Sequence, residues 1–180
     1  MADPVSPTGV DTPTEVSVVT SDEQTDVEVD ADRWGRLAVE ALRSERRTGE
    51  LTLTFVDCDE ISLLNTEHMG KTGPTDVLSF PLDACDDVEA GSASPEVGPV
   101  LLGDVVICPS VAAEAAPGHA GTLDDELALL TVHGVLHVLG HDHLGPTDSA
   151  RMRRRELELL EAHHWSGPAP TGFVQEQRAP

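Results

Sequence analysis

The sequence predicts an α+β fold in which a small mixed β-sheet of about four strands is packed with helices. Short runs of β-branched and apolar residues alternate along the chain with longer segments whose apolar residues recur every three to four positions. A length of 180 residues suits one domain with its own core. Four of the eight histidines fall between residues 131 and 143, which predicts a metal site on a central helix and the turn after it.

The elements expected in the first half of the chain alternate between strand and helix. In order, they are a strand over residues 15–20, a helix over 33–47 capped by Asp30 or Asp32, a half-buried strand over 50–56, and a short helix from 57–59 to 67. A glycine-rich loop over residues 68–76 then leads to the run 77–80. This run is short and stops at Pro81, so we expect an edge strand.

The second half contains the most strand-like run of the chain. Residues 83–99 are acidic and rich in Gly, Ser and Pro, which predicts an exposed hairpin excursion. Residues 100–108 are mostly apolar, as a central strand should be, and we expect this strand to lie under the helix that bears the histidines. Three helices are expected last, over residues 109–118, about 122–139 and 146–164.

Composition predicts one folded domain over residues 14–165. Residues 1–13 are expected to form a disordered acidic arm and residues 166–180 a flexible tail. No apolar run approaches the roughly 20 residues of a membrane span, and the N-terminus lacks the features of a secretory signal. The three widely spaced cysteines are expected to stay reduced. These features predict a cytoplasmic protein with no membrane partner.

The net charge of −22 limits how the chain can bind other molecules. Lys and Arg number 11 against 33 Asp and Glu, and residues 1–32 hold nine of the acidic residues. Such a protein repels polyanions, because phosphate binding normally depends on Lys and Arg. Any polyanionic substrate must therefore be held by a local basic patch or by the metal.

The spacing of three histidines predicts a catalytic zinc site with one ion per chain. His133 and His137 are four residues apart, which puts them on one face of a helix. Gly140 follows where a helix can end in the left-handed conformation, so the chain can turn and bring His143 over the same face. Three imidazoles with an open fourth position are typical of catalytic zinc, although nickel, copper and iron accept the same ligands.

Gly134 separates this motif from that of the metzincin peptidases, which share the spacing His-x3-His-x2-Gly-x2-His. Those enzymes carry a Glu directly after the first histidine as general base. Its replacement by Gly134 argues that hydrolysis is organised differently here. A metallopeptidase-like hydrolase remains an alternative, because a distant Glu could act as the base.

Two more residues of the cluster have open roles. His141 is expected to point away from the metal or to make an outer contact. Asp142 either orients a ligand imidazole by accepting its second N–H, or only caps the turn.

Three segments of the chain together resemble one family. They are residues 133–143, Pro74-Thr-Asp-Val-Leu-Ser-Phe-Pro81 and Gly103-Asp-Val-Val-Ile107, and they resemble the YbeY family of bacterial endoribonucleases, which mature ribosomal RNA. The resemblance extends over residues 15–164. It implies an α+β metallo-endoribonuclease domain with one zinc ion in a cleft, bound by His133, His137 and His143.

The implied activity is zinc-dependent cleavage of single-stranded RNA. The resemblance assigns it to maturation of the 16S rRNA 3′ end and to ribosome quality control, with ribosomal RNA and the ribosome or its proteins as partners. The predicted nucleophile is the metal-bound water, or else the ribose 2′-hydroxyl, and no side chain is assigned as catalytic. A ribosome assembly factor with a purely structural metal is a further alternative.

Met69 departs from the family pattern, because many members carry an Arg at this position for substrate handling. Lys71 could reach the same cleft, or it is only an exposed loop lysine. Ser79 either lines the cleft or is the polar position of an edge strand. The densest basic cluster, Arg151 with Arg153 to Arg155, is expected to hold RNA together with Lys71 or to pair with neighbouring acids.

Overall fold

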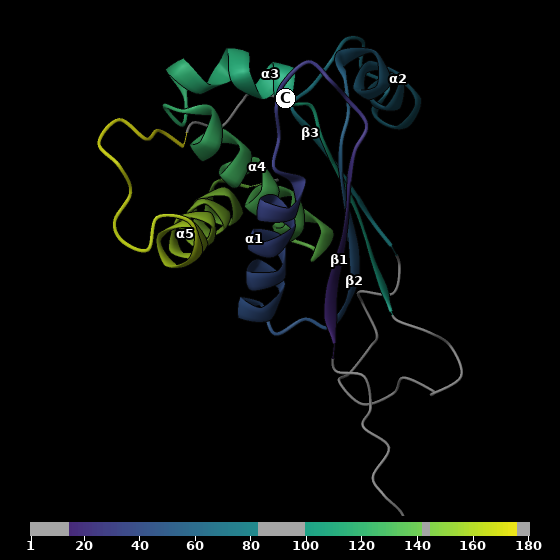
Figure 1. Cartoon of the computed structure of the whole chain (residues 1–180). Helices are drawn as coiled ribbons and strands as arrows, with labels where there is room; N and C mark the ends of the chain where they lie inside the picture. Colours follow the sequence, from purple (N-terminus) through teal and green to yellow (C-terminus); the bar gives the residue numbers. More distant parts are fainter. Residues whose placement is uncertain (1–14, 83–99, 142–144, 176–180) are drawn as a thin grey trace, which may run out of the picture.

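The chain folds into one mixed sheet with helices on both of its faces (Figure 1). The computed structural model describes residues 15–82, 100–141 and 145–175, and within them four strands and five α-helices. The strands are β1 (Val16–Asp22), β2 (Gly49–Phe55), β3 (Val77–Pro81) and β4 (Leu101–Ile107). The helices are α1 (Ala31–Ser44), α2 (Cys58–Met69), α3 (Pro109–Ala115), α4 (Leu123–Val138) and α5 (Pro146–His163), with a 3-10 turn, η2 (Ala116–Gly118). The predicted α+β class is confirmed.

The strand order is β1-β2-β4-β3, with β1, β2 and β4 parallel and β3 antiparallel to β4. Parallel neighbours need a crossover connection, and α1 supplies it between β1 and β2. The predicted edge strand is confirmed as β3, and the predicted central strand as β4. One row of the register runs from Leu53 through Val105 to Ser79, which places the side chain of Ser79 on the same face of the sheet as that of Val105.

The main core lies between the sheet and the two helices α1 and α4. β2 alternates as expected, with Leu51, Leu53 and Phe55 fully buried. α1 begins after Asp30, whose side chain accepts a hydrogen bond from the Arg33 N–H, and its apolar stripe is buried as its period predicts.

A smaller core lies on the opposite face, under α2. Ile61 of α2 packs there with Val106 and Leu78, whose side chains point away from the main core because successive residues of a strand face opposite sides. Cys58 and Cys108 meet in this core with their sulfur atoms 3.6 Å apart, both as free thiols. Burial above all raises the pKa of Cys108 to about 11.

α4 is the central helix, because most of its residues are buried and those from Leu127 to Val138 are mainly apolar. Its N-cap is Thr122, which accepts a hydrogen bond from the Asp125 N–H. Gly140 has a φ of +86°, the left-handed conformation that the sequence predicts. The N–H of His141 donates to the carbonyl of Leu136 over 3.0 Å, which completes a Schellman end to the helix.

The segment after α5 lies back against the helices. Trp165 and Phe173 pack edge to face with ring centroids 4.8 Å apart, and the Val174 N–H donates to the His119 carbonyl over 3.0 Å. Residues 166–180 were predicted to form a flexible tail, and the described part of this tail makes specific contacts as far as Gln175. The predicted arm over residues 1–13 and hairpin over 83–99 lie outside the described residues. Within the described ranges, no helix is long and apolar enough to cross a membrane.

Candidate functional site

A cavity of about 530 Å³ lies where α2, the loop after it, β3 and the end of α4 meet. Its lining residues are Asn65, Met69, Lys71, Thr75, Val77, Leu78, Ser79, Pro81, His133, His137, Gly140 and His141. The cavity thus brings together His133, His137, Lys71 and Ser79 from three separate parts of the sequence. This placement agrees with the interpretation that Lys71 and Ser79 line the cleft.

His133 and His137 lie side by side on one face of α4. Their ring centroids are 4.5 Å apart, and both side chains are half-buried at the cavity wall. Neutral imidazoles are good zinc ligands, so this donor pair fits such an ion. The predicted third ligand, His143, and the predicted outer-shell residue, Asp142, lie outside the described residues. Among the residues that are described, no group of three or more His, Cys, Asp or Glu side chains could hold a metal.

Glu156 of α5 contacts the imidazole of His133. Its Oε1 lies 2.7 Å from the Nδ1 of His133, and its Oε2 accepts a hydrogen bond from the Gln175 amide over 2.6 Å. Only 4% of Glu156 is exposed. Sequence analysis missed this residue, although a signal was present. Glu156 occupies an apolar position of its helix, four residues after Met152 and four before Leu160, both buried.

Gly134 faces the sheet, not the cavity. A Cβ at this position would lie 2.4 Å from Cγ1 of Val105, and the Ser79 hydroxyl donates to the Gly134 carbonyl over 3.3 Å. A larger side chain here would collide with Val105 of β4. Gly134 is therefore explained by close packing of helix against sheet.

The loop that carries Lys71 is held by hydrogen bonds to α2. The Lys71 N–H donates to the Asn65 carbonyl over 3.3 Å, and its own carbonyl accepts from the Thr66 hydroxyl over 3.0 Å. The Asn65 side-chain amide donates to the Gly73 carbonyl over 2.9 Å. These bonds keep the Lys71 backbone at the cavity. Asn65 and Thr75 also line the cavity, and sequence analysis missed both.

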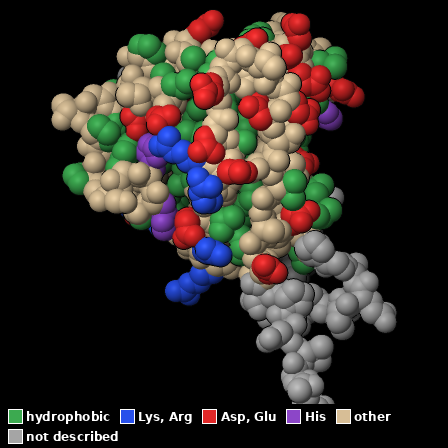
Figure 2. Space-filling model, viewed as in Figure 1, with side chains coloured by type: hydrophobic (Ala, Val, Ile, Leu, Met, Phe, Trp, Pro, Cys, Tyr) green, Lys and Arg blue, Asp and Glu red, His purple; other side chains and the backbone are tan. Residues whose placement is uncertain are grey.

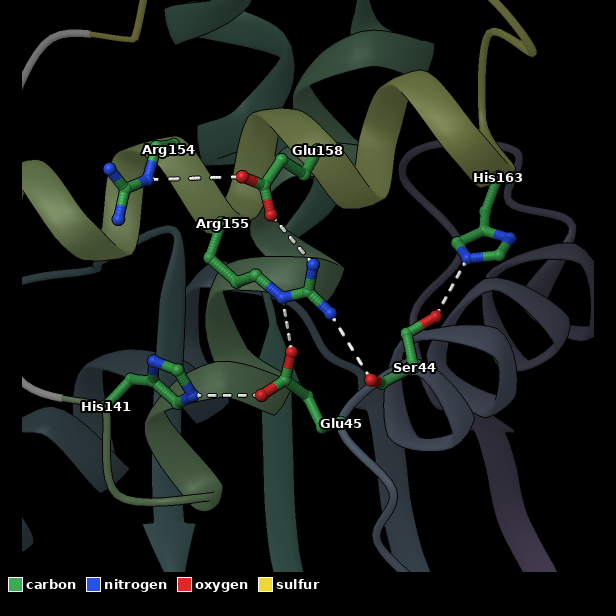
Figure 3. Close-up of polar contacts among 7 residues, drawn as sticks. All are labelled: Ser44, Glu45, His141, Arg154, Arg155, Glu158 and His163. Carbon is green, nitrogen blue, oxygen red and sulfur yellow. Dashed lines mark hydrogen bonds and ion pairs between the residues drawn. The ribbon is translucent and has the colours of Figure 1, made fainter.

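His141 points its Nε2 toward Glu45, at the end of α1, over 3.2 Å (Figure 3). The other oxygen of Glu45 accepts from Nε of Arg155 over 2.5 Å, and Arg155 also pairs with Glu158 over 2.8 Å. Burial alone would lower the pKa of Arg155, but the hydrogen bonds and charges of these two carboxylates outweigh it and raise the pKa. Arg155 therefore pairs with acids, as one of the two interpretations of the basic cluster expected.

Acidic side chains are spread over the face shown in Figure 2, whereas the Lys and Arg side chains gather in a strip over α1 and α5. Several arginines of α1 and α5 are paired: Arg33 with Asp124, Arg43 with Glu40, and Arg155 with Glu45. An anionic ligand therefore meets little attraction over most of this face.

Comparison with known proteins places this chain in a family. The family model described as Endoribonuclease YbeY matches residues 19–164. The chain belongs to this family. Proteins named Endoribonuclease YbeY from Nocardia farcinica and Mycolicibacterium vanbaalenii are 47% identical over 114 residues and 42% identical over 132 residues. The first match covers 62% of this chain and 60% of the relative, and the second covers 72% and 69%.

A solved structure supports the fold independently. The solution structure of a Thermotoga maritima protein matches with a TM-score of 0.53 at 20% identity, over 88% of this chain and 99% of that chain. Within the YbeY family pattern, the departure at Met69 falls in the cavity itself, with the side chain 45% exposed at its wall. Lys71 is the one Lys or Arg among the described lining residues.

Proposed function

We propose that the chain is a zinc-dependent endoribonuclease that cleaves single-stranded RNA during ribosomal RNA processing. Three observations support this proposal: the membership of the Endoribonuclease YbeY family, the relatives that carry the same name, and the paired imidazoles of His133 and His137 at the wall of a cavity. The pair of imidazoles is the observation that carries the chemistry. Maturation of the 16S rRNA 3′ end and ribosome quality control are the processes that we propose, with ribosomal RNA and ribosomal proteins as partners. A cytoplasmic location remains a prediction.

The proposed metal ligands are His133, His137 and His143. A zinc ion bound there would supply a Lewis acid for a phosphoryl oxygen and would lower the pKa of a water molecule. The chain itself would orient the ligands: α4 fixes the spacing of the first two, and the left-handed Gly140 turns the chain back after them. No side chain is needed as general base in this arrangement, which agrees with Gly134.

Lys71 would hold an RNA phosphate. Its ammonium group belongs to a loop that hydrogen bonds fix against α2, on the cavity that also contains the two histidines. No Phe or Trp occurs among the described residues that line the cavity, so base stacking would add little affinity. A cavity of this size has room for part of one strand and not for a duplex. We therefore expect weak, salt-dependent binding of single strands.

The non-catalytic assembly factor is the second candidate, and Met69 favours it. Without the cation that many family members carry at this position, the cavity holds RNA through Lys71 and the metal alone. A protein of this kind would bind zinc and would leave RNA intact unless a partner supplied further phosphate contacts.

Metal analysis and a cleavage assay on one preparation would test the proposal. Bound metal is counted first, and the protein is then incubated with labelled single-stranded RNA, duplex RNA and an unfolded protein. Zinc near one equivalent, with cleavage of single strands that His137→Ala abolishes, is the expected result. Zinc without cleavage of RNA would favour the assembly factor. Cleavage of the unfolded protein would favour the peptidase.

Lys71→Ala would test how the substrate is held. Loss of one phosphate contact should reduce the slope of log affinity against log salt for single-stranded RNA by about 0.7. Arg154→Ala is the matched control, because it removes the same charge from an exposed side chain that pairs with Glu158 and does not line the cavity. Equal effects of the two changes would show a general effect of charge and would remove Lys71 from the site.

A further inference from the structure

The strongest feature that the proposed function leaves unused is the buried carboxylate behind His133. We propose that Glu156 is a positioning residue for the metal site, which fixes the His133 imidazole and offsets part of the charge of the bound ion, and that Gln175 holds Glu156 in turn. This inference rests on the proposed zinc site and extends it to two residues outside the histidine motif.

The geometry determines which nitrogen of His133 faces the metal. An ionised carboxylate only accepts hydrogen bonds, so the Nδ1 of His133, 2.7 Å from Oε1 of Glu156, must carry the proton. In this tautomer Nε2 has the lone pair that a metal ion binds. A carboxylate partner on the second nitrogen also makes the imidazole a more basic ligand. The tautomer and the orientation of the ring are thus set before the metal arrives.

Gln175 fixes the second oxygen of the same carboxylate. Its amide donates to Oε2 of Glu156 over 2.6 Å and to the Arg153 carbonyl over 3.1 Å. Both oxygens of Glu156 are therefore engaged, and the carboxylate cannot rotate without losing one partner. The segment after α5 is itself held by the contact of Trp165 with Phe173 and by the hydrogen bond from Val174. The C-terminal segment is in this way connected to the metal site.

The charge of Glu156 matters because the three proposed ligands are themselves neutral. Three imidazoles bring no charge to a divalent ion, and Glu156 is almost fully buried beside one of them. A negative charge at this place stabilises the bound ion more strongly than it would in water. Removal of an outer-shell partner of this kind typically lowers metal affinity by about 10- to 100-fold.

Two substitutions separate the charge from the hydrogen bond. Glu156→Gln keeps the shape and an acceptor oxygen but removes the charge, and we expect about a tenfold loss of zinc affinity. Glu156→Leu removes the acceptor as well, and we expect a loss nearer to 100-fold. Gln175→Ala leaves the carboxylate in place but frees one oxygen, and a smaller loss is expected.

The chain offers a matched control on α4, the helix that carries His133. Glu126 is fully buried and lies 2.8 Å from the Nδ1 of His119, so it forms a second pair of buried glutamate and histidine. Neither residue lines the cavity. Glu126→Gln therefore removes a comparable buried charge and should leave zinc affinity unchanged, even where it lowers the melting temperature by a similar amount.

The test measures zinc affinity by competition with a chromophoric chelator, and histidine tautomers by nitrogen NMR in the metal-free protein. We expect the order wild type, Gln175→Ala, Glu156→Gln, Glu156→Leu in decreasing affinity, with Glu126→Gln at the wild-type value. The His133 signals should show the proton on Nδ1 in the wild type and a mixture of tautomers in Glu156→Leu.

The outcomes separate this inference from the proposed function. If the wild type binds zinc and the Glu156 variants bind it equally well, the positioning role is overturned and the zinc site stands. If the wild type binds no zinc, the proposed metal chemistry fails and the inference fails with it. Equal losses in the Glu156 and Glu126 variants would show a general effect of destabilisation, which also overturns the positioning role.

Discussion

Gly134→Ala would test whether the glycine between the two histidines is required by packing. The added methyl carbon would lie 2.4 Å from Cγ1 and 3.1 Å from Cγ2 of Val105, well inside the roughly 3.5–4.0 Å of a normal carbon contact. Val105 is fully buried in β4, between β2 and β3, so it has little room to move. Relief requires a strained rotamer of Val105 or a shift of α4 away from the sheet.

The expected magnitude follows from two opposing terms. Overpacking of a well-packed core costs about 1–3 kcal/mol. Alanine is the better helix former by about 1 kcal/mol, which offsets part of that cost. Because a contact of 2.4 Å is a severe overlap, the overpacking cost should lie in the upper part of its range, and we expect Gly134→Ala to lower the free energy of unfolding by about 1–2 kcal/mol. A shift of α4 would also move His133 and His137, so zinc affinity should fall with stability.

Urea unfolding of four proteins would measure this effect: wild type, Gly134→Ala, Val105→Ala and the double variant. In the Val105→Ala background the added methyl group fills the space of the removed ones, so Gly134→Ala should be neutral or stabilising there. The coupling energy between the two positions should exceed about 1 kcal/mol. Gly118→Ala is the control, because no atom lies within 4 Å of its added carbon, and it should stay within about 0.5 kcal/mol of wild type. If Gly134→Ala were as stable as wild type in the native background, the packing argument would be refuted.

Three further predictions concern ion pairs and thiols. Arg155→Ala should cost about 1 kcal/mol of unfolding free energy, because it breaks partly exposed ion pairs with Glu45 and Glu158, and should leave RNA affinity unchanged in a filter-binding assay; a clear loss of RNA affinity would return Arg155 to the substrate site. Burial alone would raise the pKa of Asp125, but hydrogen bonds from Thr122, Trp165 and His164 outweigh it and hold the pKa below its ordinary value of 3.8. The unfolded state therefore binds the proton more tightly, so the carboxylate stabilises the fold above pH 3.8, and this contribution is lost as the pH falls through the lowered pKa. Asp125→Asn should accordingly be less stable than wild type at pH 7 in denaturant unfolding, with a difference that shrinks in strong acid, and a constant difference would contradict the assignment. Iodoacetamide at pH 8 should alkylate Cys58 faster than Cys108, because the buried Cys108 with a pKa of about 11 forms little thiolate; equal rates in peptide mass spectra would contradict its burial.

The sequence was sufficient for the features that depend on neighbours along the chain. The amphipathic period of α1, the cap at Asp30 and the alternation of β2 are all local, and the structure has them where they were expected. The proline after residue 80 and the apolar run before Cys108 were enough to separate an edge strand from a central one. The spacing of His133 and His137 fixed their common face, because a helix returns to the same side after about one turn.

Tertiary structure alone decided the roles of residues whose partners lie far away in the sequence. Glu156 reaches His133 from another helix, Gln175 reaches Glu156 from the segment beyond it, and no helical or strand period encodes such contacts. Gly134 looked like a missing catalytic base in the sequence, whereas in the structure it packs closely against Val105 of β4. A side chain's local pattern shows which side of its own element it occupies, but only the packing of elements determines what lies opposite.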